Sequence, residues 1–240
     1  AELEDEGLED NLALWVHDPR YEDFGGEHEV ELSQELGKAD SALDETRIPL
    51  LYDHHEMGTL KLRQADMAFF PTDTPLTCIT VHGENYDAFQ VWINNEELLI
   101  HGLADWYRAR EVPVGAVLTV RRGDEDDDFA VSWDGEIDDL IALPDERINV
   151  LLNMREPAEI ENWSVYEIMR NTLAGHPDGV HFLTIWAEVN VIRRTPKRVV
   201  ASNLSSYHCF VQVTNTERWK LDERKVDQGR KKTKKKFIIQ

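Results

Sequence analysis

The sequence has few of the features that mark secreted or membrane proteins. It contains two cysteines, Cys78 and Cys209, which are too few for a disulfide framework or a cysteine-rich zinc cluster. No run approaches 18 consecutive apolar residues, so a membrane-spanning helix is not expected. The chain opens on acidic residues, unlike the basic start of a signal peptide. We therefore expect no membrane contact and a reducing compartment, either the cytoplasm, associated with the nucleoid, or the nucleus.

Motifs for catalysis and for cofactor binding are also missing. There is no Gly-x-Gly-x-x-Gly, no phosphate-binding loop and no nucleophile elbow. The adjacent pair His54 and His55 has no second metal ligand at helical spacing. The five contiguous acidic residues at 124–128 lack the internal glycine of a calcium-binding loop. We therefore expect no enzymatic activity, no cofactor and no bound metal.

Positive charge is scarce in the first 150 residues. They carry 37 acidic and 10 basic side chains, a net charge of −27, whereas residues 151–240 carry 10 acidic and 16 basic side chains, a net charge of +6. Together these give the formal net charge of −21. A polyanion would be repelled by the first part and attracted by the second. The asymmetry indicates two parts with different functions.

The 240 residues, of which 41% are hydrophobic, are enough for two small domains with packed cores. Short alternating segments dominate the first half after the N-terminal region, and helical periodicity dominates the end. We expect a partly disordered acidic arm at 1–45, a small β-barrel at 46–135, a linker at 136–161, a winged helix at 162–225 and a basic tail at 226–240. The predicted fold class is α+β, with a small β-barrel followed by a winged helix-turn-helix.

The N-terminal region has too many carboxylates for a packed core. Segment 1–10 contains six acidic residues and no basic one. The apolar residues that follow, Leu12, Leu14, Trp15 and Val16, form an island that could dock on another surface. A mobile acidic arm is the first interpretation, and an arm that binds a partner or mimics DNA is the second.

The barrel prediction rests on short strands separated by turns. The alternating stretch 89–93 meets Asn94 and Asn95, a good turn pair, before the apolar stretch 97–100. A single helical stretch at 102–111 follows, with Leu103, Trp106 and Tyr107 on one face. Six short strands with one interposed helix favour a small barrel over a βαβ sheet.

The winged-helix prediction rests on three helix starts and a hairpin. Ser164 and Glu167 form a capping box, a second helix is expected after the turn residues 176–179, and Thr195 and Pro196 have the pattern of an N-cap followed by a first helical residue. Apolar residues at helical spacing follow each start. Segments 209–213 and 217–221 then read as a β-hairpin. Three short helices followed by a hairpin are typical of a winged helix.

Two regions resemble known families. Residues 164–221 resemble the HARE-type winged helix of the bacterial RNA polymerase delta subunit and of chromatin factors, through Tyr166-Glu167-Ile168, Thr195-Pro196 and the hairpin. That resemblance implies DNA contact or docking onto transcription and chromatin machinery. Residues 58–122 are more faintly similar to the DNA-binding pseudobarrels of plant auxin-response factors and restriction-enzyme effector domains, through 89–92, 102–107 and 114–120. This second family inserts basic strand residues into the major groove, whereas the region here is acidic.

Basic residues gather where a winged helix contacts duplex DNA. A helix N-terminus favours a phosphate, and small polar side chains can reach base edges. Arg230 and Lys231 begin a lysine-rich tail that predicts salt-dependent contact without sequence preference, or docking on the acidic part of the same chain. The candidate contacts are Arg193, Arg194, Lys197, Arg198, Ser202, Asn203, Arg218 and Lys220, with Arg230, Lys231, Lys232, Lys234, Lys235 and Lys236 as nonspecific contacts.

The sequence therefore favours a double-stranded DNA-binding protein involved in transcription regulation. Its acidic β domain would modulate binding or recruit a protein partner. One alternative is a protein-interaction subunit of a transcription, repair or defence complex. Another is the recognition part of a DNA-cutting or DNA-modifying enzyme whose catalytic domain lies elsewhere.

Overall fold

The computed structural model describes residues 12, 14–21, 44–83, 88–123, 127–214 and 216–231. The chain divides into two compact units. The N-terminal unit is His17–Asn149, and the C-terminal unit combines Ala1–Val16 with Val150–Gln240. Residues 1–45, which were expected to form one acidic arm, are therefore divided between the two units. The apolar residues up to Val16 belong to the C-terminal unit, and the rest belong to the N-terminal unit.

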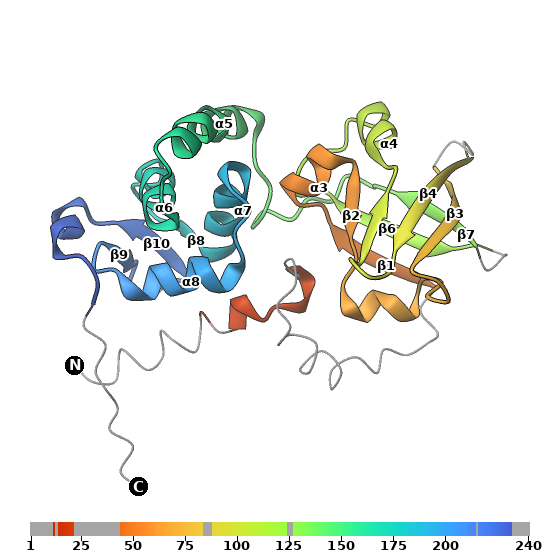
Figure 1. Ribbon diagram of the computed structural model, residues 1–240, viewed down its shortest axis with the longest axis horizontal. Coiled ribbons are helices and arrows are strands. Elements are labelled where there is room, and N and C mark those ends of the chain that lie inside the picture. Colours follow the sequence, from red (N-terminus) through yellow and green to blue (C-terminus); the bar gives the residue numbers. More distant parts are fainter. Residues whose placement is uncertain are drawn as a thin grey trace, which may run out of the picture. The chain divides into compact units, whose positions relative to one another are not determined.

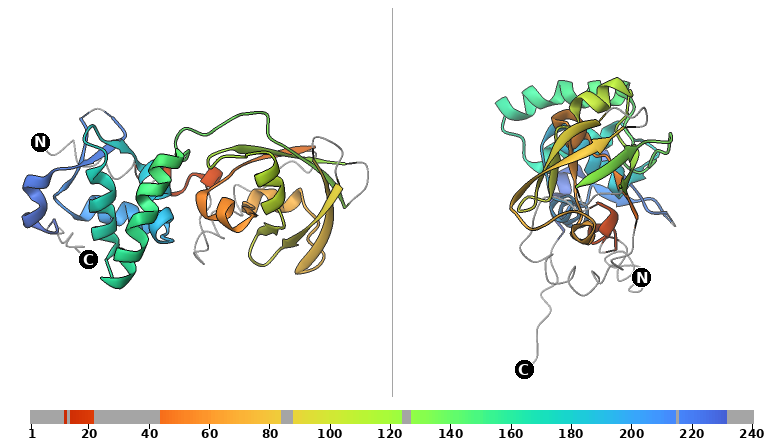
Figure 2. Two further views of the ribbon diagram at one scale, coloured as in Figure 1. Left: turned by 90° about the horizontal axis from the view of Figure 1, so that it is seen from above. Right: turned by 90° about the vertical axis from the view of Figure 1, so that its right-hand side faces the viewer.

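Seven described strands of the N-terminal unit form one sheet that is curled into a nearly closed barrel (Figures 1 and 2). Neighbouring strands are antiparallel except β3 and β7, which are parallel. Across the sheet the strands are β1 (Glu45–Pro49), β6 (Val117–Arg122), β7 (Asp128–Ser132), β3 (Leu76–His82), β4 (Ala88–Asn94), β5 (Leu99–His101) and β2 (Thr59–Lys61). The predictions of an α+β protein and a small barrel are confirmed.

The hairpin between β4 and β5 forms where the asparagine pair predicted it. Trp92 lies opposite His101 and Asn94 opposite Leu99. The side-chain oxygen of Asn94 accepts hydrogen bonds from the backbone amides of Glu96 and Glu97, at 3.1 and 3.0 Å. Asparagine stabilises turns in this way because its short amide can reach backbone groups two residues further on.

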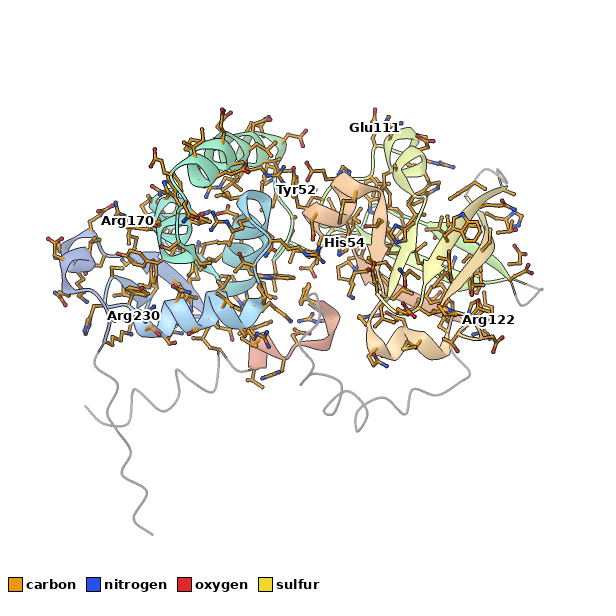
Figure 3. The ribbon with its side chains drawn as sticks, in the orientation of Figure 1. Tyr52, His54, Glu111, Arg122, Arg170 and Arg230 are labelled. Carbon is orange, nitrogen blue, oxygen red and sulfur yellow. The ribbon has the colours of Figure 1, made fainter. Side chains whose placement is uncertain are left out.

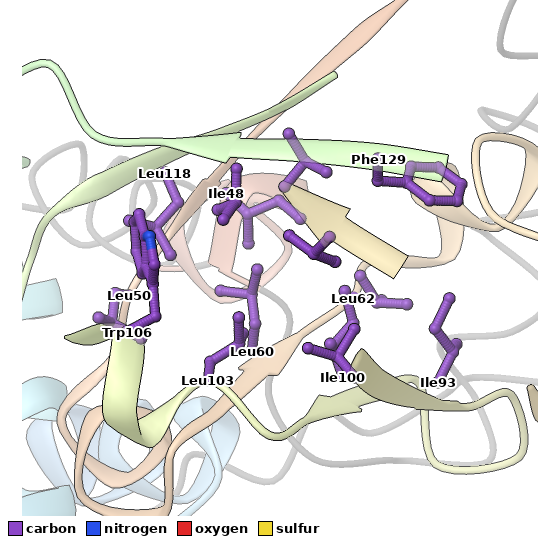
Figure 4. Close-up of a cluster of buried hydrophobic side chains, with 14 of the residues drawn as sticks. Ile48, Leu50, Leu60, Leu62, Ile93, Ile100, Leu103, Trp106, Leu118 and Phe129 are labelled. Carbon is purple, nitrogen blue, oxygen red and sulfur yellow. The ribbon is translucent and has the colours of Figure 1, made fainter. Parts of the chain in front are cut away.

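Two short helices, α3 (Tyr52–Met57) and α4 (Ala104–Ala109), complete the N-terminal unit with the 3₁₀ turns η1 (Pro19–Tyr21) and η2 (Gln64–Ala68). Gly58 ends α3 in the left-handed conformation at φ 65°, and a Cβ there would lie 2.4 Å from the Cβ of Ala104. Only glycine therefore allows this approach. Leu103, Trp106 and Tyr107 are buried as predicted. They join apolar strand residues in one core, in which Ile48, Leu60, Ile93, Ile100, Leu118 and Phe129 are labelled in Figure 4.

Two buried phenols of the N-terminal unit, those of Tyr21 and Tyr107, predict that the stability of the unit falls at alkaline pH. Burial raises the pKa of Tyr107 well above 10, and its hydroxyl donates to the carbonyl of Thr59 at 2.9 Å. Burial and a hydrogen bond to Asp138 also raise the pKa of Tyr21. The folded unit thus keeps protons that the unfolded chain releases above about pH 10. The contribution of these two phenols to the free energy of unfolding is therefore fully present below about pH 10 and is lost as the pH rises further. Circular dichroism from pH 8 upward checks this expectation. Tyr107→Phe should weaken the pH dependence, and an unchanged dependence would contradict the assignment.

The C-terminal unit contains helices and a three-stranded antiparallel sheet in the order β8-β10-β9. Gly179, at φ 81°, precedes β8, and a Cβ on it would lie 2.8 Å from the Cγ2 of Val213. Helix α5 (Asp145–Ile160) begins in the N-terminal unit and continues into this one from Val150. The elements that follow are α6 (Val165–Ala174), β8 (Val180–His181), α7 (Phe182–Ile192), α8 (Lys197–Ser206), β9 (Phe210–Gln212), β10 (Arg218–Leu221) and η3 (Glu223–Gln228). No helix in the described part of the chain is long and apolar enough to cross a membrane.

Local sequence predicted one helix start correctly and misplaced another by one residue. The capping box of Ser164 and Glu167 is present at α6. Pro196, rather than Thr195, is the N-cap of α8, and it provides no side-chain cap. Asn190 accepts from the amide of Thr195, and the hydroxyl of Thr195 donates to the carbonyl of Arg193. These bonds direct Thr195 toward α7, so its side chain does not cap the first turn of α8.

The second half of the segment expected to be a linker forms α5. Of its side chains, Leu151 and Ala158 are buried. Pro157 lies inside the helix, where proline ordinarily interrupts helical hydrogen bonding. The weak apolar periodicity and the internal proline explain why the sequence pattern predicted no helix there.

Candidate nucleic-acid interface

The described part of α8 exposes a polar stripe. Arg198, Ser202 and Ser205 are exposed at positions i, i+4 and i+7, which lie on one side of a helix. The opposite side buries Val200 and Leu204. The exposed stripe therefore offers one guanidinium near the helix N-terminus and two hydroxyls along the next two turns. The Ser205 hydroxyl also donates within its own helix, to the carbonyls of Ala201 and Ser202 at 3.1 and 3.2 Å, and keeps its acceptor capacity for a ligand. Hydroxyls and guanidinium groups are both able to bind phosphate or base edges.

Lys197, a predicted phosphate contact, is part of the protein interior. Its side chain is 2% exposed, and its ammonium lies 5.7 Å from the centroid of the Trp186 ring. This distance is within the range of a cation–π interaction. Because the ammonium is enclosed, it does not present itself to a phosphate, and the predicted role is corrected to a structural one.

Arg193 is also used within the protein. Its guanidinium donates to the carbonyls of Ala158, at 3.2 Å, and Trp163. Ala158 lies in the last turn of α5, where the helix dipole favours a cation, and its carbonyl also accepts from the backbone amide of Trp163 at 2.9 Å. Arg193 therefore links the end of α5 to the end of α7 by hydrogen bonds. Of the four predicted clamp residues, Arg194 and Arg198 are exposed.

The other predicted base contact on α8 is partly occupied. Asn203 is half-buried, and its amide nitrogen donates to the carbonyl of Val199 at 2.8 Å. This bond turns the amide group back along its own helix. Ser202 is exposed.

The sheet presents two further basic residues. Arg218 is exposed and Lys220 half-buried, and both alternate with the buried Trp219 on β10. Alternation along a strand places Arg218 and Lys220 on the same face, as the sequence predicted. The structure thus brings these two residues together on one face of the sheet.

The beginning of the basic tail is attached to the end of α8. The guanidinium of Arg230 lies 5.2 Å from the centroid of the Tyr207 ring and donates to the Tyr207 hydroxyl at 3.0 Å. The amide of Lys231 donates to the carbonyl of Ser206 at 2.7 Å, and the Lys231 side chain is exposed. The tail therefore leaves the domain beside the last residues of α8. The remaining predicted contacts, Lys232, Lys234, Lys235 and Lys236, lie outside the described residues.

Sequence reasoning missed the aromatic stack that supports this attachment. The rings of Tyr166 and Tyr207 stack with centroids 4.2 Å apart, and Phe210 lies against both. Burial raises the pKa of Tyr166, a hydrogen bond with Cys209 adds to this, and Arg170 opposes it. Arg170 and Arg230 are labelled in Figure 3. Because the stack joins α6 to residues far along the chain, no local pattern could indicate it.

The described residues contain no cluster of three or more histidine, cysteine or acidic side chains that could hold a metal ion. Comparison with protein-family models finds no match, and a search among curated proteins finds no significant relative. The resemblances to the HARE-type winged helix and to the pseudobarrels therefore stay predictions.

Proposed function

We propose that the C-terminal unit is a winged helix that binds double-stranded DNA. The observation that carries the proposal is the exposed stripe of Arg198, Ser202 and Ser205 on α8, the third helix of the series α6, α7, α8. The winged-helix assignment is supported by a strand between the first two helices and by a hairpin after the third, with that strand paired to the hairpin. In such domains the third helix enters the major groove.

The exposed cations then have different roles in DNA binding. Arg198 in the first turn of α8 contacts a phosphate together with the helix N-terminus, and Ser202 and Ser205 approach base edges. Arg218 and Lys220 contact a second stretch of backbone from β10. The tail that begins at Lys231 adds affinity without sequence preference. In this assignment α8 provides the sequence-dependent contacts, and the other cations provide affinity.

Arg198→Glu in the full chain tests the proposal. The reversal replaces attraction to a phosphate by repulsion, and we expect DNA affinity to fall about tenfold at about 50 mM salt. Arg108→Glu is the matched control, because Arg108 is an exposed arginine on α4 of the N-terminal unit and its reversal changes net charge equally. Fluorescence anisotropy of a labelled mixed-sequence duplex measures both. Equal affinities for the two variants would contradict DNA binding through α8.

A protein-interaction domain is the second candidate. It is favoured by the burial of Lys197 and the internal use of Arg193, which leave Arg198 as the one basic residue on the exposed stripe of α8. A polar stripe with a single cation also fits a protein surface. Unchanged DNA affinity of Arg198→Glu, together with loss of a bound protein, would favour this function.

A further inference from the structure

Arg230 is an exposed arginine that is held in one orientation beside the end of α8. Its Nε donates to the hydroxyl of Tyr207 at 3.0 Å, and its guanidinium carbon lies 5.2 Å from the centroid of the Tyr207 ring. The backbone of Arg230 also forms an antiparallel bridge with Tyr207. The terminal nitrogens Nη1 and Nη2 have no acceptor among the residues that the structure describes. The guanidinium is therefore fixed at the surface with the open end of its fork available.

A second arginine lies at the neighbouring phenol. The Tyr207 ring stacks on that of Tyr166 with centroids 4.2 Å apart. Arg170 follows Tyr166 by one turn of α6, on the same side of that helix. Burial raises the pKa of Tyr166, and Arg170 opposes this rise by a hydrogen bond to the hydroxyl and by its charge. Each tyrosine of the stack therefore has a guanidinium group at its hydroxyl, from the two arginines labelled in this unit in Figure 3.

The positive charge of these two arginines is not neutralised by an acidic neighbour. Among the described residues no carboxylate forms an ion pair with Arg170 or Arg230, whereas Arg224 of the same unit is paired with Asp222 at 2.9 Å. The planar fork of a guanidinium matches two oxygens of a phosphate, and a fork that is already oriented loses little conformational freedom on binding. The chemistry at the end of α8 therefore fits a phosphate group.

This place is at the opposite end of α8 from Arg198. Tyr207 is the C-cap of the helix and Arg198 lies in its first turn. At 1.5 Å per residue the two positions are about 14 Å apart along the helix axis. The major groove of duplex DNA is about 12 Å wide. When α8 lies across the groove, its two ends are thus close to opposite phosphate backbones.

We propose that Arg230 binds a phosphate of the DNA backbone on the far side of the groove from Arg198. Tyr207 is a positioning residue that holds the guanidinium by its ring and its hydroxyl, and Arg170 adds positive charge at the neighbouring phenol. The inference rests on the proposed function, because it names a second point at which α8 is held on the duplex. Contacts at both ends of the helix prevent it from pivoting about either one, so they fix its register in the groove.

Arg230→Gln in the full chain tests this contact. One phosphate contact fewer lowers the slope of log affinity against log salt by about 0.9, so duplex affinity should fall about 15-fold at about 50 mM salt and about fourfold at about 200 mM, if the electrostatic contribution vanishes near 1 M. Arg224→Gln is the matched control, because it removes the same charge from an exposed arginine that is already paired with Asp222. Fluorescence anisotropy of a labelled mixed-sequence duplex measures both variants. Equal affinities and equal slopes of the two would overturn the proposal.

Arg230→Lys and Tyr207→Phe separate phosphate binding from a purely structural role. The first keeps the charge and loses the fork, and the second keeps the ring and loses the hydroxyl. Both should preserve the salt slope and weaken binding about threefold, the order of one neutral hydrogen bond. Urea unfolding of each variant gives the folded fraction under the assay conditions. If unfolded protein accounted for the loss in Arg230→Gln, or if Arg230→Lys showed the same loss of slope, the proposal would be wrong.

Arg198→Glu, measured in the same assay, distinguishes failure of this inference from failure of the proposed function. Weaker binding by both Arg198→Glu and Arg230→Gln, each with a smaller salt slope than the unmodified chain, supports contacts at both ends of α8. Weaker binding by Arg198→Glu alone would overturn the phosphate contact at Arg230 and leave the proposed function standing. No effect of either variant, or no binding by the unmodified chain, would overturn both.

Discussion

Lys197→Glu should destabilise the C-terminal unit by about 3–5 kcal/mol, because it replaces an enclosed cation with an anion. The Lys197 side chain is 2% exposed, and its ammonium faces the Trp186 ring. The negative face of that ring attracts a cation and repels a carboxylate. Protonation of the new glutamate would relieve the repulsion, but the cation–π contact would still be lost.

Arg198→Glu is the matched control for this prediction, since it makes the same change in charge one residue further on. Arg198 is exposed, so its replacement should alter stability by less than about 0.5 kcal/mol. Urea unfolding measures both variants, and hydrogen exchange of peptides from α7 and α8 assigns the loss to the C-terminal unit. Similar, small effects of the two variants would show that Lys197 is not enclosed.

The pair also separates folding from function. Lys197→Glu should reduce DNA binding only in proportion to the unfolded fraction, whereas Arg198→Glu should reduce it in a folded chain. Charge reversal of both residues at once would confuse the two effects. Their adjacent places in the sequence give no indication of this difference.

Arg193→Ala should cost the C-terminal unit about 1.5–3 kcal/mol, the range of a hydrogen bond that involves a charged group. The substitution leaves the carbonyls of Ala158 and Trp163 without their guanidinium donor. It also removes a cation from the C-terminal end of α5. We expect faster hydrogen exchange in the last turn of α5 and an earlier unfolding transition in urea.

Arg194→Ala is the control for Arg193→Ala. Arg194 is exposed, and the loss of an exposed side-chain interaction costs at most about 1 kcal/mol. If Arg193 were a phosphate contact instead, its replacement would weaken DNA binding without affecting the exchange of α5. That outcome would contradict the structural role.

Periodicity and turn chemistry were sufficient to predict the elements that depend on neighbouring residues. Asn94 predicted the β4–β5 turn, because its amide bonds to amides two and three residues further on. Ser164 and Glu167 predicted the start of α6 for the same reason. The alternation of short strands predicted the barrel, although the parallel pairing of β3 with β7 had no local signal.

The sequence by itself determined the strong charge asymmetry, the α+β class and the position of most helices and strands, because composition and local hydrogen bonding act over a few residues. Only the tertiary structure decided which cations are available. Lys197 and Arg193 are turned inward by Trp186 and by the end of α5, whereas Arg198 and Arg218 face solvent. It also brought Trp15 onto His181. Such contacts join residues that are distant in the chain. Whether a charged side chain is buried or exposed therefore decides its role more than its residue type does.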